Sequence, residues 1–411
     1  MDELQKEYEE LKALNLNIDM TRGRPSARQL ALSERLLNID FSYTGIDGVD
    51  VRNYGLIPGI TEARQLMGEI LEEDAQNTLV VGSSSLQLMY ESVQRAIQYG
   101  VRGNVPWQKL NHVKFLCPSP GYDRHFTICE AFDIDMITVK LLETGPDMDT
   151  VEKLVAEDPS IKGIWVVPQY QNPTGITFSD ETVRRLANMK VAAPDFTIFW
   201  DNAYAVHHLY DEPENQDHVL DIGKCCREAG NPDRYFKFAS LSKVTFPGSA
   251  IAAFASSEQN IREAKEHLFA QMIGSDKINQ MRHATFLKNK KGVLEHMQKH
   301  AVELRPKFET VQEVLQEGLG DVDYASWTNP KGGYFVSFNC KPGTAKRVVE
   351  IAEELGVKFT EAGSTYPFCS DPYDQNIRIA PSMPIVEELR QAMRVLVVAT
   401  KMAAEESENA A

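Results

Sequence analysis

The sequence lacks long apolar runs, an excess of basic residues and any paired-cysteine motif. No run of about 18 apolar residues occurs in the 411-residue chain, which argues against a membrane-spanning helix. Asp and Glu number 59 against 43 Lys and Arg, and the resulting net charge of −16 repels nucleic-acid phosphates. The six cysteines form no C-x-x-C pair, so we expect reduced thiols in a cytoplasmic protein and no metal site. Membrane and nucleic-acid partners are therefore not expected.

The chain also lacks internal repeats, low-complexity linkers and the basic, apolar start of a secretory signal. Its charged fraction of 25% and hydrophobic fraction of 43% are those of an ordinary globular protein. Residues 1–20 open with interleaved acidic and basic side chains and predict an amphipathic helix, whereas the last residues, AAEESENAA, predict a solvated tail. The length indicates two or three domains.

Short apolar runs alternate with longer helical patterns between residues 78 and 290. This alternation predicts an α/β domain with a mainly parallel sheet. The apolar runs lie at 78–81, 113–117, 163–167, 196–200 and 235–240. Each run delivers polar residues at its carboxyl end, and open α/β sheets bind ligands in the crevice beyond those ends. We therefore expect a binding site at that edge of the sheet.

A second pattern begins near residue 291. It opens with a long charged helical stretch and continues with GGYFVSFNC, another helical pattern and NIRIAP. This order predicts a smaller α+β domain. The predicted division is an N-terminal segment, 1–48, that joins the small domain, a large domain, 49–290, and the small domain itself, 291–411.

A lysine in an apolar setting is the first chemical signal. Lys243 stands in FASLSKVTFPGSAIAAF, residues 238–254, although lysine is almost never fully buried unless it is paired. For the motif S-x-S-K alone, an ordinary exposed lysine is the simpler interpretation. If Phe246, Ile251 and Phe254 surround the amine, desolvation lowers its pKa, and the neutral amine can attack a carbonyl group.

A carboxylate follows another apolar run. Asp201 directly follows FTIFW, residues 196–200, and a carboxylate that is buried there needs a cationic partner. One interpretation is a helix N-cap, a position that favours Asp. The other is a contact to a protonated ring nitrogen of a ligand, and Tyr204 then offers its phenol to the same ligand from the following turn.

Three further motifs have both a structural and a ligand-binding interpretation. NPTG, residues 172–175, predicts a β-turn, which can aim the Asn172 amide at a ligand oxygen. GSSS, residues 82–85, predicts either a plain serine-rich cap or a helix start whose amides and hydroxyls suit a phosphate. Arg378, in NIRIAP, is either a surface arginine or a fork for a carboxylate.

The order of these motifs resembles that of the fold-type I pyridoxal-phosphate aminotransferases, class I and II. The similar motifs run through most of the chain as RGRPS, RNYGLIPGITEAR, GSSSL, NPTG, DNAY, SLSK and IRIAP. TRGRP and SLSKVTFPG are most similar to a bacterial branch of aspartate aminotransferases. The resemblance implies a large domain with a mainly parallel seven-stranded sheet between helices, a smaller α+β domain, and a homodimer with shared active sites.

The resemblance also implies roles for individual residues. Lys243 would hold pyridoxal 5'-phosphate as an internal imine and then move a proton, while Asp201 would pair with the ring nitrogen. The resemblance also implies that Tyr204 and Asn172 contact the phenolic oxygen of the cofactor and that Tyr122 lies over its ring. The implied phosphate contacts are Gly82, Ser83, Ser84 and Ser240 of the same chain, and Tyr54, which comes from a neighbouring subunit. Arg378 would bind the substrate α-carboxylate, Asn172 would also contact the substrate, and Gly23 would lie near it.

The chain departs from this family at one place. The family usually carries an arginine a few residues after the lysine that neutralises the cofactor phosphate, whereas this chain reads PGSAIAAF. Either hydroxyls such as Thr245 and Ser249 replace it, or another cation does, or cofactor affinity is reduced. An acidic substrate needs a second cation as well, and the sequence leaves five candidates open: Arg22, Arg24, Arg28, Lys277 and Arg282.

The leading hypothesis is transfer of the amino group of L-aspartate, or a similar amino acid, to 2-oxoglutarate. The alternatives are an aminotransferase for aromatic or other amino acids and a pyridoxal-phosphate lyase or decarboxylase, since the same cofactor serves all of them. A non-catalytic sensor, such as the aminotransferase-like half of a transcription regulator, is disfavoured by the negative charge and by the absence of a basic DNA-binding pattern.

Overall fold

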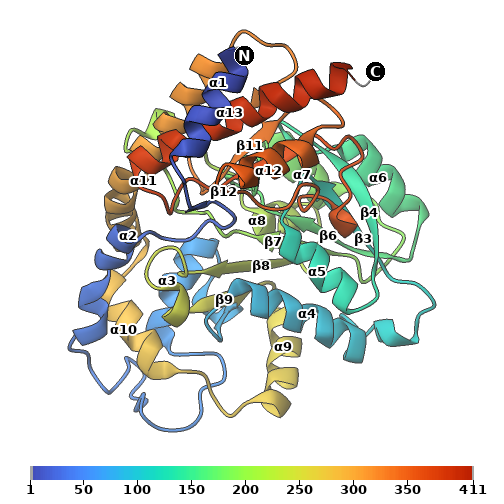
Figure 1. Ribbon diagram of the computed structural model, residues 1–411. Helices are drawn as coiled ribbons and strands as arrows, with labels where there is room; N and C mark the ends of the chain where they lie inside the picture. The colour runs from blue at the N-terminus through green and yellow to red at the C-terminus, as the bar shows by residue number, and fades with distance from the viewer. Residues whose placement is uncertain (1–2, 410–411) are drawn as a thin grey trace.

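A central sheet organises the molecule. The computed structural model describes residues 3–409, and within them an eight-stranded sheet lies among helices (Figure 1) in the order β2-β9-β8-β7-β6-β3-β4-β5. Strands β8, β7, β6, β3 and β4 pair in parallel, whereas β9 and β5 are antiparallel to their neighbours. The strands are β2 (Thr78–Val80), β3 (Lys114–Ser119), β4 (Asp135–Leu142), β5 (Gly145–Pro146), β6 (Ile161–Val166), β7 (Thr197–Asp201), β8 (Tyr235–Ser240) and β9 (Ala252–Ala255).

The apolar runs of the sequence correspond to these strands. All five predicted runs form strands, which confirms the mainly parallel α/β sheet. The sheet has one strand more than the expected seven, because the two-residue β5 pairs with the end of β4. Strand β3 also continues past its expected end, since Pro118 and Ser119 still pair with Val139 and Lys140 of β4.

Helices cover both faces of the sheet. Successive residues of a strand point to opposite faces, so a strand with apolar residues at every position contributes side chains to two cores. In β7, Phe199 packs into the core shared with α4 and α9, whereas Ile198 and Trp200 pack into the core shared with α6, α7 and α8. In Figure 1, α4 and α9 lie below β8. The helices around the sheet are α3 (Thr61–Leu71), α4 (Ser85–Tyr99), α5 (Asp123–Ala131), α6 (Met148–Glu157), α7 (Asp180–Asn188), α8 (Ile222–Glu228), α9 (Glu258–Gln271) and α10 (Lys277–Leu287).

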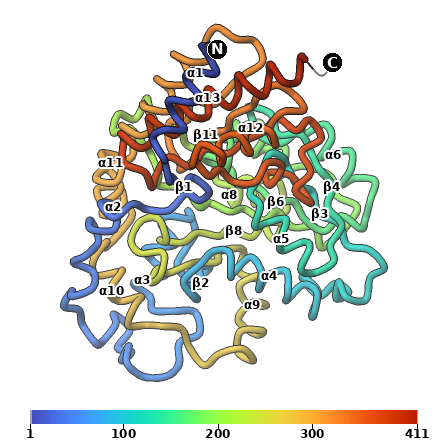
Figure 2. The backbone as a smooth tube through the Cα atoms, viewed as in Figure 1, coloured from blue at the N-terminus to red at the C-terminus, as the bar shows by residue number. Residues whose placement is uncertain are grey.

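The two ends of the chain build a second, smaller unit. Its helices are α1 (Glu3–Ala13), α2 (Ala27–Ala31), α11 (Lys290–Leu319), α12 (Ala345–Glu354) and α13 (Val386–Asn409), and its strands are β1 (Ile18–Asp19), β10 (Ser326–Trp327), β11 (Val336–Asn339), β12 (Val357–Lys358) and β13 (Asn376–Ile379). Helix α1 contacts α13, and β1 pairs with β12, so the N-terminal segment lies among C-terminal elements (Figure 2). The domain boundaries at 48/49 and 290/291 stay a prediction.

The C-terminal residues differ from the sequence-based expectation. Helix α13 continues to Asn409 instead of ending in a solvated tail, and Ala403 and Ala404 are buried. Ion pairs of Arg347 with Glu406 and of Lys341 with Glu408 hold this last part against neighbouring segments. Residues 410–411 lie outside the described part. Among residues 3–409, no helix combines the length and the apolar character that a membrane crossing needs.

Buried histidines make the fold sensitive to acid. Burial lowers the pKa of His300, which is fully buried, to about 4, whereas the unfolded chain has its usual value of about 6.5. The unfolded state therefore binds a proton first as the pH falls, so the stability contributed by this group is complete above about pH 6.5 and is lost towards pH 4. We expect the free energy of unfolding in urea to fall between pH 7 and pH 5 by about 2 kcal/mol for this group. A His300→Gln variant should show a shallower pH dependence, and an unchanged dependence would contradict this origin.

Candidate active site

A cavity of about 710 Å³ opens at the carboxyl ends of the central strands. Its walls come from a strap of the N-terminal segment, residues 21–24, from the starts of α4 and α5, from the ends of β7 and β8, and from β13. The predicted residues that line it are Gly23, Ser84, Tyr122, Asn172, Asp201, Tyr204, Ser240, Lys243 and Arg378. The cavity therefore occupies the place that the strand pattern predicts.

Three predicted residues do not line this cavity. Gly82 has a positive φ of 70°, and its carbonyl accepts a hydrogen bond of 3.2 Å from the Ala252 amide. The Ser83 carbonyl accepts from Ser242 Oγ at 3.4 Å. Both residues thus brace the turn before α4. Tyr54 is 83% exposed on the surface of this chain.

The amine of Lys243 lies against aromatic rings. Its Nζ is 5.1 Å from the ring centroid of Tyr204 and 5.8 Å from that of Tyr334. Within residues 3–409 it makes neither a hydrogen bond nor an ion pair, and burial lowers the pKa of Lys243 although the Asp201 carboxylate opposes this. The interpretation as an ordinary surface lysine is therefore wrong. Of its expected apolar neighbours, Ile251 and Phe254 pack into two separate cores, and none of the three lines the cavity.

Asp201 is the last residue of β7 and is buried. Its Oδ2 lies 3.0 Å from Nε2 of His125, while its Oδ1 is buried and has no hydrogen-bond partner among the described residues. The N-cap interpretation is wrong, because a turn and not a helix follows at 203–206. A buried carboxylate oxygen without a donor is costly, so this atom fits a ligand that brings an N–H group.

His125 is a site residue that the sequence analysis missed. Its ring stacks on Trp165 with centroids 4.6 Å apart and meets the edge of Tyr122 at 5.0 Å. It stands on α5 one turn after Tyr122, so helical spacing alone puts both on one side. Its contact with Asp201, however, joins residues that are 76 positions apart. No local pattern predicts that contact.

Two phenols of the cavity stay protonated at neutral pH. Burial is the main reason that the pKa values of Tyr122 and Tyr204 are raised, and the negative charge of Asp201 adds to it. A neutral phenol can donate a hydrogen bond to a ligand oxygen. Both side chains can therefore act as donors at the cavity.

Arg378 presents a fixed guanidinium from β13. It is only 5% exposed and lies over the Phe335 ring at 4.9 Å. Nη1 donates to Asp123 Oδ1 at 3.1 Å and to Asn172 Oδ1 at 3.4 Å, and Nη2 donates to the Thr21 carbonyl at 3.2 Å. These bonds hold the planar fork in one orientation, which suits recognition of a carboxylate.

The donor set fits pyridoxal phosphate. The free Asp201 Oδ1 suits a ring N–H group, and the unpaired Lys243 amine suits an aldehyde carbon. Ser84, Ser85, Ser240 and Ser242 bring hydroxyls to the cavity beside the start of the 15-residue α4, where main-chain amides favour anions. The cations that line the cavity come from other segments: Arg22 and Arg24 from the strap, Arg124 from α5, Lys243 and Arg378. Thr245 and Ser249, the hydroxyls named as possible replacements for the missing arginine, do not line the cavity: Thr245 Oγ1 lies 2.9 Å from His283 Nε2, and Ser249 Oγ donates to Asn279 Oδ1 at 3.4 Å.

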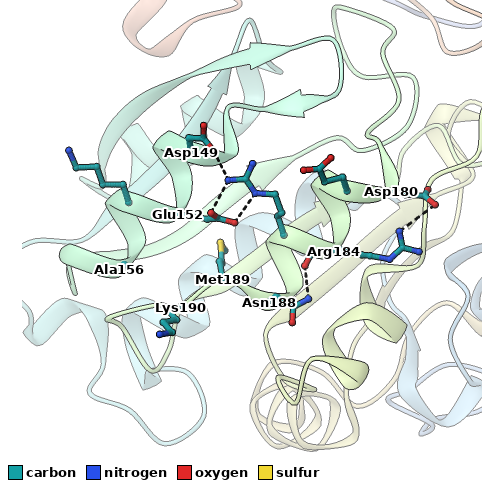
Figure 3. A pocket seen from close by; sticks show the side chains of 11 residues that line it. Asp149, Glu152, Ala156, Asp180, Arg184, Asn188, Met189 and Lys190 are labelled. Atoms are coloured by element: carbon teal, nitrogen blue, oxygen red, sulfur yellow. Dashed lines mark hydrogen bonds and ion pairs between the residues drawn. The ribbon is translucent and has the colours of Figure 1, made fainter.

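A second hollow, of about 960 Å³, lies between α6 and α7 (Figure 3). Its arginines are already neutralised, because Arg185 pairs with Asp149 and Glu152 and Arg184 pairs with Asp180. It contains none of the predicted site residues. The cavity at the strand ends is therefore the candidate active site.

Comparisons with known proteins agree with this geometry. Residues 1–410 match the family described as aspartate amino-transferase. An aspartate aminotransferase of Corynebacterium glutamicum is 44% identical over 409 residues, which cover 98% of this chain and 94% of that protein. A crystal structure of an aspartate transaminase from Corynebacterium glutamicum has a TM-score of 0.95 at 44% identity and covers 98% of this chain and 95% of its own.

A distant structure shares the fold alone. The α-aminoadipate aminotransferase LysN of Thermus thermophilus has a TM-score of 0.75 at 19% identity, over 99% of this chain and 96% of its own. The full-length match and the 44% identity are what decide the family. The chain belongs to the aspartate aminotransferase family, whose members catalyse pyridoxal-phosphate-dependent transamination.

Proposed function

We propose that the protein transfers the amino group of L-aspartate to 2-oxoglutarate, with pyridoxal 5'-phosphate held in the cavity at the strand ends. The observation that supports this most is the meeting of three groups in one cavity: the unpaired amine of Lys243, the unpaired oxygen of Asp201 and the oriented fork of Arg378. We infer a cytoplasmic location, since the cysteines are all free thiols.

Each residue of the site has a separate role in the proposed reaction. Pyridoxal phosphate, when bound, supplies an aldehyde carbon and an electron-withdrawing ring. Asp201 Oδ1 would accept a hydrogen bond from the ring nitrogen, and His125 holds the other carboxylate oxygen in place. The Nζ atom of Lys243, whose pKa burial lowers, would carry a proton between the substrate Cα and the cofactor carbon of the aldehyde group. Arg378 binds the α-carboxylate and so orients the bonds of Cα.

We assign the second carboxylate of an acidic substrate to Arg22. Arg22 lines the cavity and has no side-chain partner among residues 3–409, and the carbonyl of the preceding Thr21 touches Arg378. Arg24 also lines the cavity, but it pairs with Asp19 at 3.1 Å. Arg28, Lys277 and Arg282 do not line it: they contact Glu303, the Gly55 carbonyl and the Phe41 ring, respectively.

An Arg22→Gln variant tests the substrate class. We expect kcat/KM for aspartate and glutamate to fall about tenfold or more, because a charge-assisted contact to the second carboxylate is lost, whereas alanine and phenylalanine change little. The measurement is a panel of amino donors with 2-oxoglutarate as acceptor. Arg124→Gln is the matched control, since Arg124 also lines the cavity. A selective loss in the control instead would move the assignment to Arg124, and a wild-type preference for aromatic donors would refute the aspartate proposal.

We propose that the active unit is a homodimer. The exposed side chains of Phe269 and Ile273 line a groove of about 920 Å³ together with the half-buried Leu56 and Ile57. Phe269 is 79% exposed, and the nearby Tyr54 does not reach the cavity of its own chain. Exposed apolar surface of this kind is typical of a protein interface. Tyr54 would then contribute to the phosphate site of the other subunit.

Subunit mixing tests the shared site. Tyr54→Ala and Lys243→Ala subunits should each be nearly inactive, but a mixed dimer has one site with both lesions and one site with neither. Random reassociation should therefore restore about a quarter of the wild-type activity. The measurement is the transamination rate after the variants are unfolded and refolded together. Variants refolded separately are the control, and no recovery on mixing, or a monomeric mass by ultracentrifugation, would contradict the proposal.

A further inference from the structure

A chain of buried polar groups begins beneath Lys243. The ring of Tyr334, which is fully buried just before β11, lies 5.8 Å from the lysine Nζ. Its Oη accepts a hydrogen bond of 2.9 Å from Nε2 of Gln29, a fully buried residue of α2. The floor beneath the reactive amine is thus tied to the N-terminal segment.

From Gln29, further buried polar groups lead to the backbone beside Lys243. Nε2 of Gln29 lies 3.2 Å from Nδ1 of His300, and Nε2 of His300 lies 3.3 Å from Nε2 of His296. The latter atom is 3.0 Å from the carbonyl of Val244, the residue after Lys243. Both histidines stand on α11, one turn apart. Gln29 is therefore hydrogen-bonded to the ring beneath the lysine and to His300, which lies in contact with the histidine beside Val244.

At Gln29, the chemistry of the side-chain amide fixes which atoms donate and which accept. An amide nitrogen carries two hydrogens and accepts none, so Tyr334 Oη and His300 Nδ1 both accept from it. His300 consequently keeps its own hydrogen on Nε2. The neutral imidazole that this requires agrees with the depth of its burial. His296 Nε2 also carries a hydrogen when it bonds the Val244 carbonyl, so the two Nε2 atoms are in contact without a hydrogen bond between them.

The amide oxygen of Gln29 takes part in a different contact, at the start of α2. It accepts a hydrogen bond of 3.0 Å from the Ser26 amide, and Ser26 Oγ accepts from the Gln29 amide in return, which forms the capping box that starts α2. The strap that faces the cavity, residues 21–24, ends just before Ser26. The cap therefore sets the direction in which the strap leaves α2.

We propose that Gln29 is a positioning residue of the transamination site. Its oxygen anchors the substrate-facing strap, and its nitrogen anchors the ring beneath Lys243, so one buried amide aligns the two sides of the cavity. Gln29 itself does not line the cavity. This inference rests on the proposed role of Lys243.

Gln29→Ala should change properties that a purely structural residue would leave alone. The matched control is Gln312→Ala, because Gln312 of α11 also donates to a carbonyl, that of Thr328, at 2.9 Å and accepts from Trp327 at 3.1 Å, away from the cavity. We expect Gln29→Ala to raise KM for the amino donor about tenfold and to shift the pH midpoint of the visible cofactor absorbance, and Gln312→Ala to do neither.

A second readout needs no cofactor. Trypsin cleaves after arginine unless proline follows, so the exposed Arg22 of the strap is a cleavage site, whereas Arg24, which precedes Pro25, is not. Gln29→Ala should speed this cut about tenfold in the cofactor-free protein, whereas Gln312→Ala should not. If both variants match the wild type in cleavage rate, KM and absorbance midpoint, the proposal is overturned. If the wild type itself does not transaminate, the proposed function fails, yet the cleavage rate still tests the hold of Gln29 on the strap.

Tyr334→Phe covers the case in which Gln29→Ala does not fold. It keeps the ring and removes only the oxygen that accepts from Gln29. We expect it to shift the absorbance midpoint in the same direction as Gln29→Ala, to leave the cut after Arg22 unchanged, and to add nothing further to the midpoint shift in the double variant. An unchanged midpoint in folded Tyr334→Phe would overturn the proposed alignment of Lys243.

Discussion

Replacing Lys243 with alanine should lower kcat for transamination by about 10⁴-fold or more, because a positioned group that moves a proton contributes on that scale. The variant should also lose the visible absorbance of cofactor joined to the lysine. Steady-state assays with aspartate and 2-oxoglutarate and an absorbance spectrum of the purified variant measure both effects.

The same change should not weaken the fold. The amine of Lys243 has no hydrogen-bond or ion-pair partner within residues 3–409, and burial opposes its charge. Removing it leaves no partner unsatisfied, so we expect the melting temperature of the cofactor-free protein to stay or to rise. Lys331→Ala, at a side chain that is 47% exposed, is the control and should keep full activity. Retained activity in Lys243→Ala would remove the basis of the proposed mechanism.

Asp201→Asn should lower kcat by about 10²- to 10³-fold, the range found when one group that stabilises transition-state charge is removed. The neutral amide has the size of the carboxylate and still offers an oxygen to His125, but it no longer keeps a ring nitrogen protonated. The fold should therefore survive. The assay is kcat at saturating substrate, together with the cofactor dissociation constant.

A second aspartate provides the matched control for this prediction. Asp195 is buried just before the opposite end of β7, and both of its oxygens are paired, with Trp107 Nε1 at 2.8 Å and with Lys162 Nζ at 2.7 Å. Asp195→Asn should thus lower stability by about 1–3 kcal/mol, because buried donors lose a charged acceptor, and should leave kcat nearly unchanged. The reverse pattern, an active Asp201→Asn and an inactive but stable Asp195→Asn, would show that the free oxygen of Asp201 has no catalytic meaning.

Local pattern was enough to predict the elements that carry the site. An apolar run of five or six residues reports burial on both faces of a parallel strand, and the carboxyl ends of such strands meet at one edge. That reasoning places Asp201 and Ser240 at one edge of the sheet, where both line the cavity. It was less reliable at the ends of elements, as the helical residues 403–409 show, because ion pairs from other segments decide where a helix stops.

The sequence by itself determined the class of sheet, the lysine, the carboxylate and the arginine, since each depends on residue type and on the few residues around it. Only the tertiary structure decided which distant side chains complete them. His125 reaches Asp201 across 76 positions, and Gln29 reaches His300 across 271. A periodic pattern states which face of a helix is buried, but the partner on the other side depends on how the helices and the sheet pack, and that is a property of the whole chain.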